Sequence, residues 1–213
     1  MFGLNKEELR TLRSLSTPAK IQDFLETLEI NFEERGETCM SPRRVLRAGK
    51  AHCMEGAMLA ALALRIQGER PLVVDLEAAM DDEDHVIAVF RKYRRWGAIT
   101  KSNHAVLRYR EPVYRSIREL SLSFFHEYFK DDGRKTLRSY SAPVNLARFD
   151  RRGWITSEKN IWYIPRYLAK IPHTKIISRS QIRGLRRADP IECKAGKLVD
   201  WHKPLKEIAP AVD

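Results

Sequence analysis

Residues 49–57, with the sequence GKAHCMEGA, place Cys53 in the first turn of a helix predicted over residues 53–67. The N-terminus of a helix offers unpaired N–H groups and about half a positive charge. Both favour a thiolate over a thiol, which predicts a lowered pKa for Cys53 and a role as a nucleophile. The backbone N–H of Cys53 would also face an oxyanion formed on an attacked carbonyl.

A histidine suited to act as the general base follows on a predicted strand. His85 begins the strand expected over residues 85–90, directly after the acidic loop of residues 81–84. A strand packed across the helix N-terminus would bring this ring to the sulfur of Cys53. A cysteine on a helix, a histidine on a strand and a polar residue on the next strand are typical of general base catalysis with an orienting third group.

Four segments together resemble the core of the transglutaminase-like superfamily, whose members are related to papain-type thiol enzymes. The resemblance covers residues 39–103 and is to small bacterial members of the superfamily. It implies a transglutaminase-like, cysteine-proteinase-like fold, with Cys53 as the nucleophile, His85 as its base, and no cofactor. The segments that carry it are GKAHCMEGAMLAALALRIQG, PLVVDL, HVIAVF and WGAIT.

The third member of the expected triad departs from the family pattern. The family places an aspartate four residues after the tryptophan of the third strand, and from Trp96 that position is Thr100. Ser102 and Asn103 are the other polar candidates. We favour Asn103 because asparagine serves this role in papain-like enzymes. Strand alternation instead puts Trp96, Thr100 and Ser102 on one face and Asn103 on the other, unless a bulge intervenes.

This departure bears on activity. A hydroxyl or an amide orients an imidazole but does not stabilise imidazolium as a carboxylate would. Many relatives also supply an oxyanion donor, often a tryptophan, upstream of the cysteine, whereas the first tryptophan here is Trp96. Weakened or altered catalysis is therefore expected, and a degenerate site stays open as an alternative.

Each candidate also has a structural interpretation. Cysteine is among the most buried residue types, so Cys53 alone would fit a buried structural thiol, and His85 alone a hydrogen-bonded histidine at a strand end. His52 adjoins Cys53, but adjacent residues at a helix start point in different directions, so no direct role is expected. Cys39 and Cys193 have no metal-ligand spacing with any histidine and are expected to be structural thiols.

No metal site is expected. The acidic run at residues 81–84 lacks the spaced oxygen ligands and the glycine of a calcium loop, so it is interpreted as a solvated turn.

The elements that must position these residues are predicted from periodicity and capping signals. The expected class is α+β, with a helical N-terminal portion and a buried, Cys53-bearing helix against a small antiparallel sheet. Residues 1–177 are assigned to one transglutaminase-like domain and residues 178–213 to a basic C-terminal extension. The expected helices cover residues 5–15, 17–30, 41–49, 53–67 and 112–129, and the strands residues 71–76, 85–90, 96–100 and 136–140.

Charge is the unusual bulk property. The 213 residues carry a formal net charge of +11, with a mean hydropathy of −0.46. The positive charges are scattered rather than gathered on one element, so a nucleic-acid partner is the less favoured interpretation. No run approaches the length of a membrane helix, no secretory signal is recognised, and three widely spaced cysteines fit a reducing cytoplasm.

The function that these features favour is thiol-dependent acyl chemistry on an amide or peptide bond. Cys53 would attack, His85 would carry the proton and Asn103 would orient His85. Water as the acceptor would give hydrolysis, and an amine would give acyl transfer. The expected substrate is a peptide or amide, and an acidic one is an option. The alternative is a catalytically decayed fold that binds an acidic partner or nucleic acid.

Overall fold

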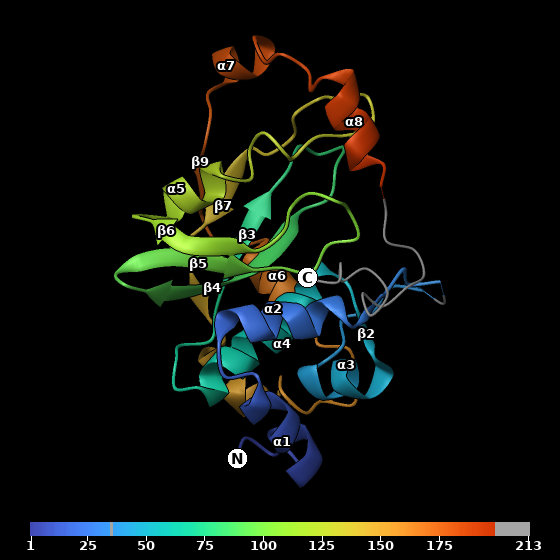
Figure 1. Ribbon diagram of the computed structural model, residues 1–213, viewed down its shortest axis with the longest axis vertical. Helices are drawn as coiled ribbons and strands as arrows, with labels where there is room; N and C mark the ends of the chain where they lie inside the picture. Colours follow the sequence, from blue (N-terminus) through green and yellow to red (C-terminus); the bar gives the residue numbers. More distant parts are fainter. Residues whose placement is uncertain (35, 199–213) are drawn as a thin grey trace, which may run out of the picture.

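The chain folds around one antiparallel sheet with helices packed against it, in agreement with the expected α+β class (Figure 1). The structure is a computed structural model that describes residues 1–34 and 36–198. The strands run in the spatial order β6-β5-β4-β3-β7-β9, and β8 also pairs with β3. The strands of this sheet are β3 (Leu72–Glu77), β4 (His85–Lys92), β5 (Arg95–Ile99), β6 (Arg110–Tyr114), β7 (Ser139–Ser141), β8 (Val144–Asn145) and β9 (His173–Lys175).

The N-terminal helices gather around one long helix, α4, on one side of the sheet (Figure 1). Asn5, Thr17 and Ser41 accept a backbone N–H at the start of α1, α2 and α3, which explains where these helices begin. The short strands β1 (Glu29–Ile30) and β2 (Lys50–Ala51) pair in parallel. The helices are α1 (Lys6–Ser14), α2 (Pro18–Glu26), α3 (Pro42–Ala48), α4 (Cys53–Ile66), α5 (Ile117–Leu122), α6 (Tyr163–Leu168), α7 (Arg179–Arg183), α8 (Pro190–Gly196) and the 3-10 helix η1 (Leu146–Arg152).

Helix α4 is the centre of the main hydrophobic core. Every residue from Met54 to Leu64 is buried, because the helix packs on β4 and is surrounded by α1, α2 and α3. A helix that is apolar on all sides is stable only in such surroundings. At its C-terminal end, Arg65 makes a two-fold hydrogen bond to Asp150 of η1, with both N···O distances 2.7 Å. Helix α4, over Cys53–Ile66, confirms the helix expected over residues 53–67.

Strands β3, β4 and β5 lie where the sequence predicts strands. Residues 72–76 of β3 and 85–90 of β4 are buried without alternation, because both faces of these central strands are covered. Apolar residues on one face belong to the core around α4. Those on the other face, such as Val74 and Ile87, belong to a second core that includes Leu120 of α5.

The helix expected over residues 112–129 is wrong. Residues 110–114 form β6, and only Ile117–Leu122 are helical, as α5. Strand β6 lies at the edge of the sheet, where Pro112 is tolerated because an edge strand needs fewer backbone donors. Ser116 then caps α5 by accepting the N–H of Glu119. The apolar side chains of Phe124, Phe125 and Tyr128 are buried from turns rather than from a helix.

The C-terminal segment returns to the rest of the chain. Helix α8 comes near residues 103–105, because His104 bonds to the carbonyl of Gly196 and the N–H of Ala105 donates to the carbonyl of Leu198. Residues 199–213 of the expected basic extension lie outside the described residues. Within residues 1–34 and 36–198, no helix has the length and apolar character needed to cross a membrane.

Candidate active site

Cys53 is delivered to the start of α4 by a tight local path. Helix α3 ends at Gly49, whose φ of +66° is a left-handed conformation that glycine adopts without strain. Strand β2 follows at once and pairs with β1, and His52 is the N-cap residue of α4. Cys53 is therefore the first helical residue, at the N-terminal end of the helix dipole, and it is partly exposed.

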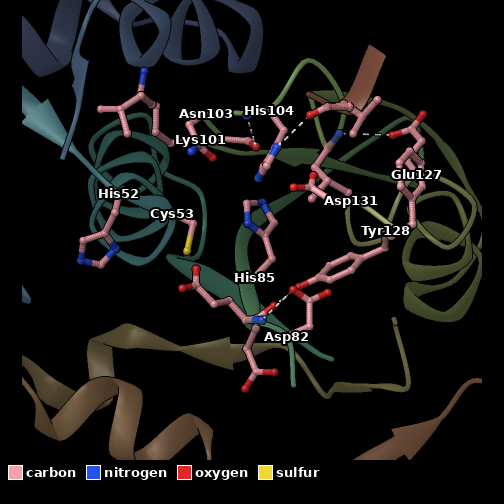
Figure 2. Close-up of a pocket in the computed structure, with 18 of the residues that line it drawn as sticks. His52, Cys53, Asp82, His85, Lys101, Asn103, His104, Glu127, Tyr128 and Asp131 are labelled. Atoms are coloured by element: carbon pink, nitrogen blue, oxygen red, sulfur yellow. Dashed lines mark hydrogen bonds between the residues drawn. The ribbon is translucent and has the colours of Figure 1, made fainter. Parts of the chain in front are cut away.

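His85 is the first residue of β4, is 7% exposed, and lines the same cavity as Cys53. Figure 2 shows the sulfur of Cys53 turned toward the side of the site that holds the His85 ring. The His85 Nε2 atom lies 2.6 Å from the hydroxyl oxygen of Thr100, the first residue after β5. The structure therefore brings Cys53 and His85 to one site, as the sequence predicts.

Thr100, and not Asn103, is the hydrogen-bond partner of His85. The Thr100 hydroxyl lies 3.3 Å from the carbonyl oxygen of Leu107, to which it donates. Its oxygen then accepts the Nε2 proton of His85, which leaves Nδ1 for the thiol. The β4–β5 register pairs Ala88 with Ile99. Continued beyond the end of β5, strand alternation places residues 85 and 100 on one face, in neighbouring diagonal positions.

Asn103 and Ser102 lie in the wall of the same cavity. Ser102 accepts the backbone N–H of His104. No hydrogen bond joins Asn103 to His85 in the part of the chain that the structure describes. The orienting contact expected of Asn103 is thus made by a residue that the sequence left as an alternative, because the chain turns away from the sheet after β5.

The surroundings of Cys53 favour the thiolate. Burial raises the pKa of the thiol, but hydrogen bonds from His52 and from His85, together with the charges of both rings, outweigh it. The pKa of Cys53 is lowered to about 5, against about 8.5 for a free cysteine. A thiol pKa of this value favours the thiolate at neutral pH. Cys39 differs, because burial and then the charge of Glu55 raise its pKa to about 12, which suits a structural thiol.

His52 is a contact that the sequence analysis did not anticipate. Its side chain reaches Cys53, although the two residues are adjacent, and Figure 2 shows it on the opposite side of Cys53 from His85. Its Nε2 atom lies 3.4 Å from the carboxylate of Glu55 and 3.2 Å from the carbonyl oxygen of Thr38. The available signal was the His52–Glu55 spacing of three residues, since Glu55 at the third helical position bonds back to the N–H of the N-cap residue.

The cavity in front of Cys53 has a volume of about 660 Å³ and an acidic lining. Asp81 and Glu127 are ion-paired to Arg134 and Arg110. In contrast, Asp82, Glu83 and Asp131 have no ion-pair partner among the described residues. The carboxylates of the lining are those of Glu33, Asp81, Asp82, Glu83, Asp84, Glu127 and Asp131, and its other charged or titratable groups are Lys101, His52, His85, His104, Cys53, Tyr128 and Cys193.

The acidic loop is a hydrogen-bonded turn. Asp84 accepts the N–H of Ala78 at 2.8 Å, and the hydroxyl of Tyr128 donates to the carbonyl oxygen of Glu83 at 2.6 Å. Among residues 1–34 and 36–198, no group of three or more His, Cys, Asp or Glu side chains has an arrangement that would hold a metal ion.

No protein-family model matches the chain, and a search of curated proteins finds no match. The chemistry of the site therefore has to be argued from its own geometry, and the class that this geometry fits is that of thiol–imidazole sites.

Proposed function

We propose that the chain carries out thiol-dependent acyl chemistry on an amide or peptide bond, as a small transglutaminase-like protein. One observation carries the proposal. A thiolate-forming cysteine lies at a helix N-terminus, beside an imidazole that is held by a hydrogen bond, and both line one cavity. This arrangement combines an activated nucleophile, a proton carrier and an orienting group.

The reaction follows from these positions. The Cys53 thiolate attacks the carbonyl carbon, and the backbone N–H of Cys53 at the helix start faces the oxyanion. Protonated His85 gives its proton to the leaving amine as the C–N bond breaks, and a thioester remains on Cys53. His85 then takes a proton from water, whose oxygen attacks the thioester and restores the thiolate. An amine in place of water yields a transferred acyl group.

Thr100 acts through His85 as a positioning residue. Thr100→Val keeps the shape but leaves Nε2 of a buried ring without its acceptor, which costs about 1–3 kcal/mol. We expect turnover of p-nitrophenyl acetate to fall about tenfold or more, with an altered pH–rate profile. Thr100→Ser keeps the hydroxyl and is expected to retain most of the turnover. Equal loss in both variants would remove the hydroxyl from the mechanism.

The charge of the cavity bears on the substrate. Carboxylates dominate its lining, whereas the chain as a whole carries +11. Charges of one sign inside a cleft raise the local concentration of ligands of the opposite sign. An acidic substrate would be repelled, so we propose a peptide or amide with a cationic side chain near the reacting bond.

The test is a library of quenched fluorescent peptides that carry Lys or Arg, or Asp or Glu, on either side of each candidate bond. We expect cleavage, or transfer to an added amine, only with an intact Cys53, and at least about tenfold faster for the cationic peptides at low salt. Asp131→Asn should reduce the ratio of the rates for cationic and acidic peptides. Asp23→Asn, on the exposed face of α2, should leave this ratio unchanged. If no peptide reacts and no acyl group is found on Cys53, the proposed function fails.

The alternative, a binding protein without catalysis, has one observation in its favour. The end of β4 and the turn that follows it present Arg91, Lys92 and Arg94 to solvent, with Tyr93 79% exposed. Cationic and aromatic side chains in alternation bind nucleic-acid strands. A binding constant for single-stranded RNA that falls steeply with salt, and that an Arg91→Ala, Arg94→Ala variant loses, would favour this alternative.

A further inference from the structure

A carboxylate is buried within one helical turn of the candidate nucleophile. The side chain of Glu55 is 0% exposed, at the third position of α4. It accepts hydrogen bonds from the N–H of Met40 at 2.7 Å, the hydroxyl of Thr38 at 2.9 Å and the amide of Asn31 at 3.0 Å. All three groups donate, and the carboxylate oxygens of Glu55 accept from each of them. A buried negative charge is costly unless a positive charge lies beside it.

His52 is placed to be that positive charge. Its Nε2 atom lies 3.4 Å from Glu55 and 3.8 Å from Glu33. The same atom lies 3.2 Å from the carbonyl oxygen of Thr38, which only accepts, so Nε2 carries a proton. His52 directly precedes Cys53 in the chain, and among the interactions that raise the pKa of His52 the one with Cys53 is the largest.

We propose that the site has a second pair beside His85 and Thr100, formed by the His52 imidazole and the Glu55 carboxylate. This pair holds a fixed positive charge against the Cys53 thiolate, while His85 carries the proton that is transferred during the reaction. His52 is thus a positioning residue for charge, and the proposal rests on the proposed function of the same site. In an ordinary triad one histidine both carries the proton and, through its carboxylate partner, holds the positive charge. Here His85 would carry the proton and His52 would hold the charge.

This division accounts for the departure at Thr100. A hydroxyl beside His85 orients the ring without stabilising its protonated form, so the ion pair with the thiolate needs support from elsewhere. Glu55 supplies the missing carboxylate through His52, whose side chain lies on the opposite side of Cys53 from His85 in Figure 2. His85 is then free to alternate between its protonated and neutral forms during a turnover.

The charges that surround His52 fix its pH range. Glu33 from the segment after β1, Glu55 of α4 and the thiolate of Cys53 face its ring, and Lys101 lines the same cavity with Nζ donating to the carbonyl of Leu28. Burial lowers the pKa of His52, but the contacts with Cys53, Glu55 and Thr38 outweigh it and raise the pKa to about 9. The fixed charge therefore persists through neutral pH.

The first test compares His52→Gln with His126→Gln, which alters a histidine on the surface. The rate of alkylation of Cys53 by iodoacetamide is measured from pH 4.5 to 9.5. If loss of His52 raises the thiol pKa from about 5 to about 7, the thiolate fraction at pH 6 falls about tenfold. We expect that loss at pH 6, a rate near that of wild type at pH 9.5, and no change in His126→Gln, whose histidine is exposed and lies outside the cavity lining. Glu55→Gln should follow His52→Gln.

A measurement on the unaltered chain covers the case in which these variants fail to fold. The ring carbons of His52 are followed by NMR against pH in the wild type and in Cys53→Ser. We expect a midpoint near 9 in the wild type and a lower midpoint once the thiolate is gone.

The outcomes separate this proposal from the proposed function. An acidic thiol in the wild type that His52→Gln leaves unchanged, or a His52 ring that titrates near pH 6.5, overturns the second pair and leaves the proposed function standing. A thiol that titrates normally in the wild type overturns both.

Discussion

His85→Ala is expected to form an acyl-enzyme with p-nitrophenyl acetate but to release the acetyl group about 10²–10⁴ times more slowly than the wild type. The nitrophenolate leaves without a proton, so the attack needs only the thiolate of Cys53. Hydrolysis of the thioester needs a base to activate water, and His85 is the ring held for that task at 2.6 Å from Thr100. The loss should therefore fall on the second step.

The two steps are separated by pre-steady-state kinetics at pH 8. A burst of nitrophenolate reports acylation, and the slow phase that follows reports release. Cys53→Ser should show no burst, and His126→Ala, which removes an exposed histidine outside the cavity, should match the wild type. Release at the wild-type rate in His85→Ala would exclude His85 as the base.

Gly56→Ala is expected to destabilise the fold and to displace the site. A Cβ atom at position 56 would lie 2.5 Å from the Cβ of Lys101, which is 1% exposed and anchored by Nζ to the carbonyl of Leu28. Such overpacking costs about 1–3 kcal/mol or more, and the better helix propensity of alanine returns only about 1 kcal/mol. Because this contact joins α4 to the segment after β5, the change should also separate Cys53 from the His85–Thr100 pair.

Urea unfolding gives the free energy of unfolding, and iodoacetamide gives the reactivity of Cys53 at pH 6. Gly184→Ala is the matched control, because its φ is −96° and its nearest neighbour would lie 3.7 Å from the new Cβ. We expect a lower unfolding midpoint and a slower thiol in Gly56→Ala alone. A variant as stable as the wild type would show that α4 and residue 101 can move apart without cost.

The elements around the nucleophile could be predicted from the sequence because their signals are local. Helix α4 follows from a run of small and apolar residues that only Glu55 and Arg65 interrupt and that stops at Gly68, and β4 follows from an apolar run after an acidic turn. Residues 112–129 could not be predicted in the same way. Their apolar spacing fits a helix, but the edge position of β6 in the finished sheet decides the conformation of residues 110–114.

The sequence predicts the two residues of the site that depend on local signals, but not the contacts that depend on the folded chain. Cys53 and His85 follow from position on their elements, whereas the choice between Thr100 and Asn103 depends on where the chain leaves the sheet after β5. The spacing of His52 and Glu55 indicates their local capping contact. The path of residues 31–40 around Glu55 is set only in the folded chain.

The acidic cavity is a product of the fold. Its carboxylates come from the segment after β1, from the turn before β4 and from residues 127–131. These segments are far apart in the chain. The net charge of the whole chain, +11, would instead favour an anionic ligand. The negative charge of the cavity therefore follows from the fold and not from the composition of the chain.

The most direct test of the central claim is the pH dependence of the alkylation of Cys53 in the wild-type chain. Iodoacetamide is added from pH 4 to 10, and peptide mass spectrometry follows Cys53 separately from Cys39 and from Cys193, which lines the same cavity. We expect a reactivity that rises through a midpoint near pH 5 and stays level through neutral pH. A midpoint near the ordinary value of about 8.5 would contradict an activated thiolate at this site.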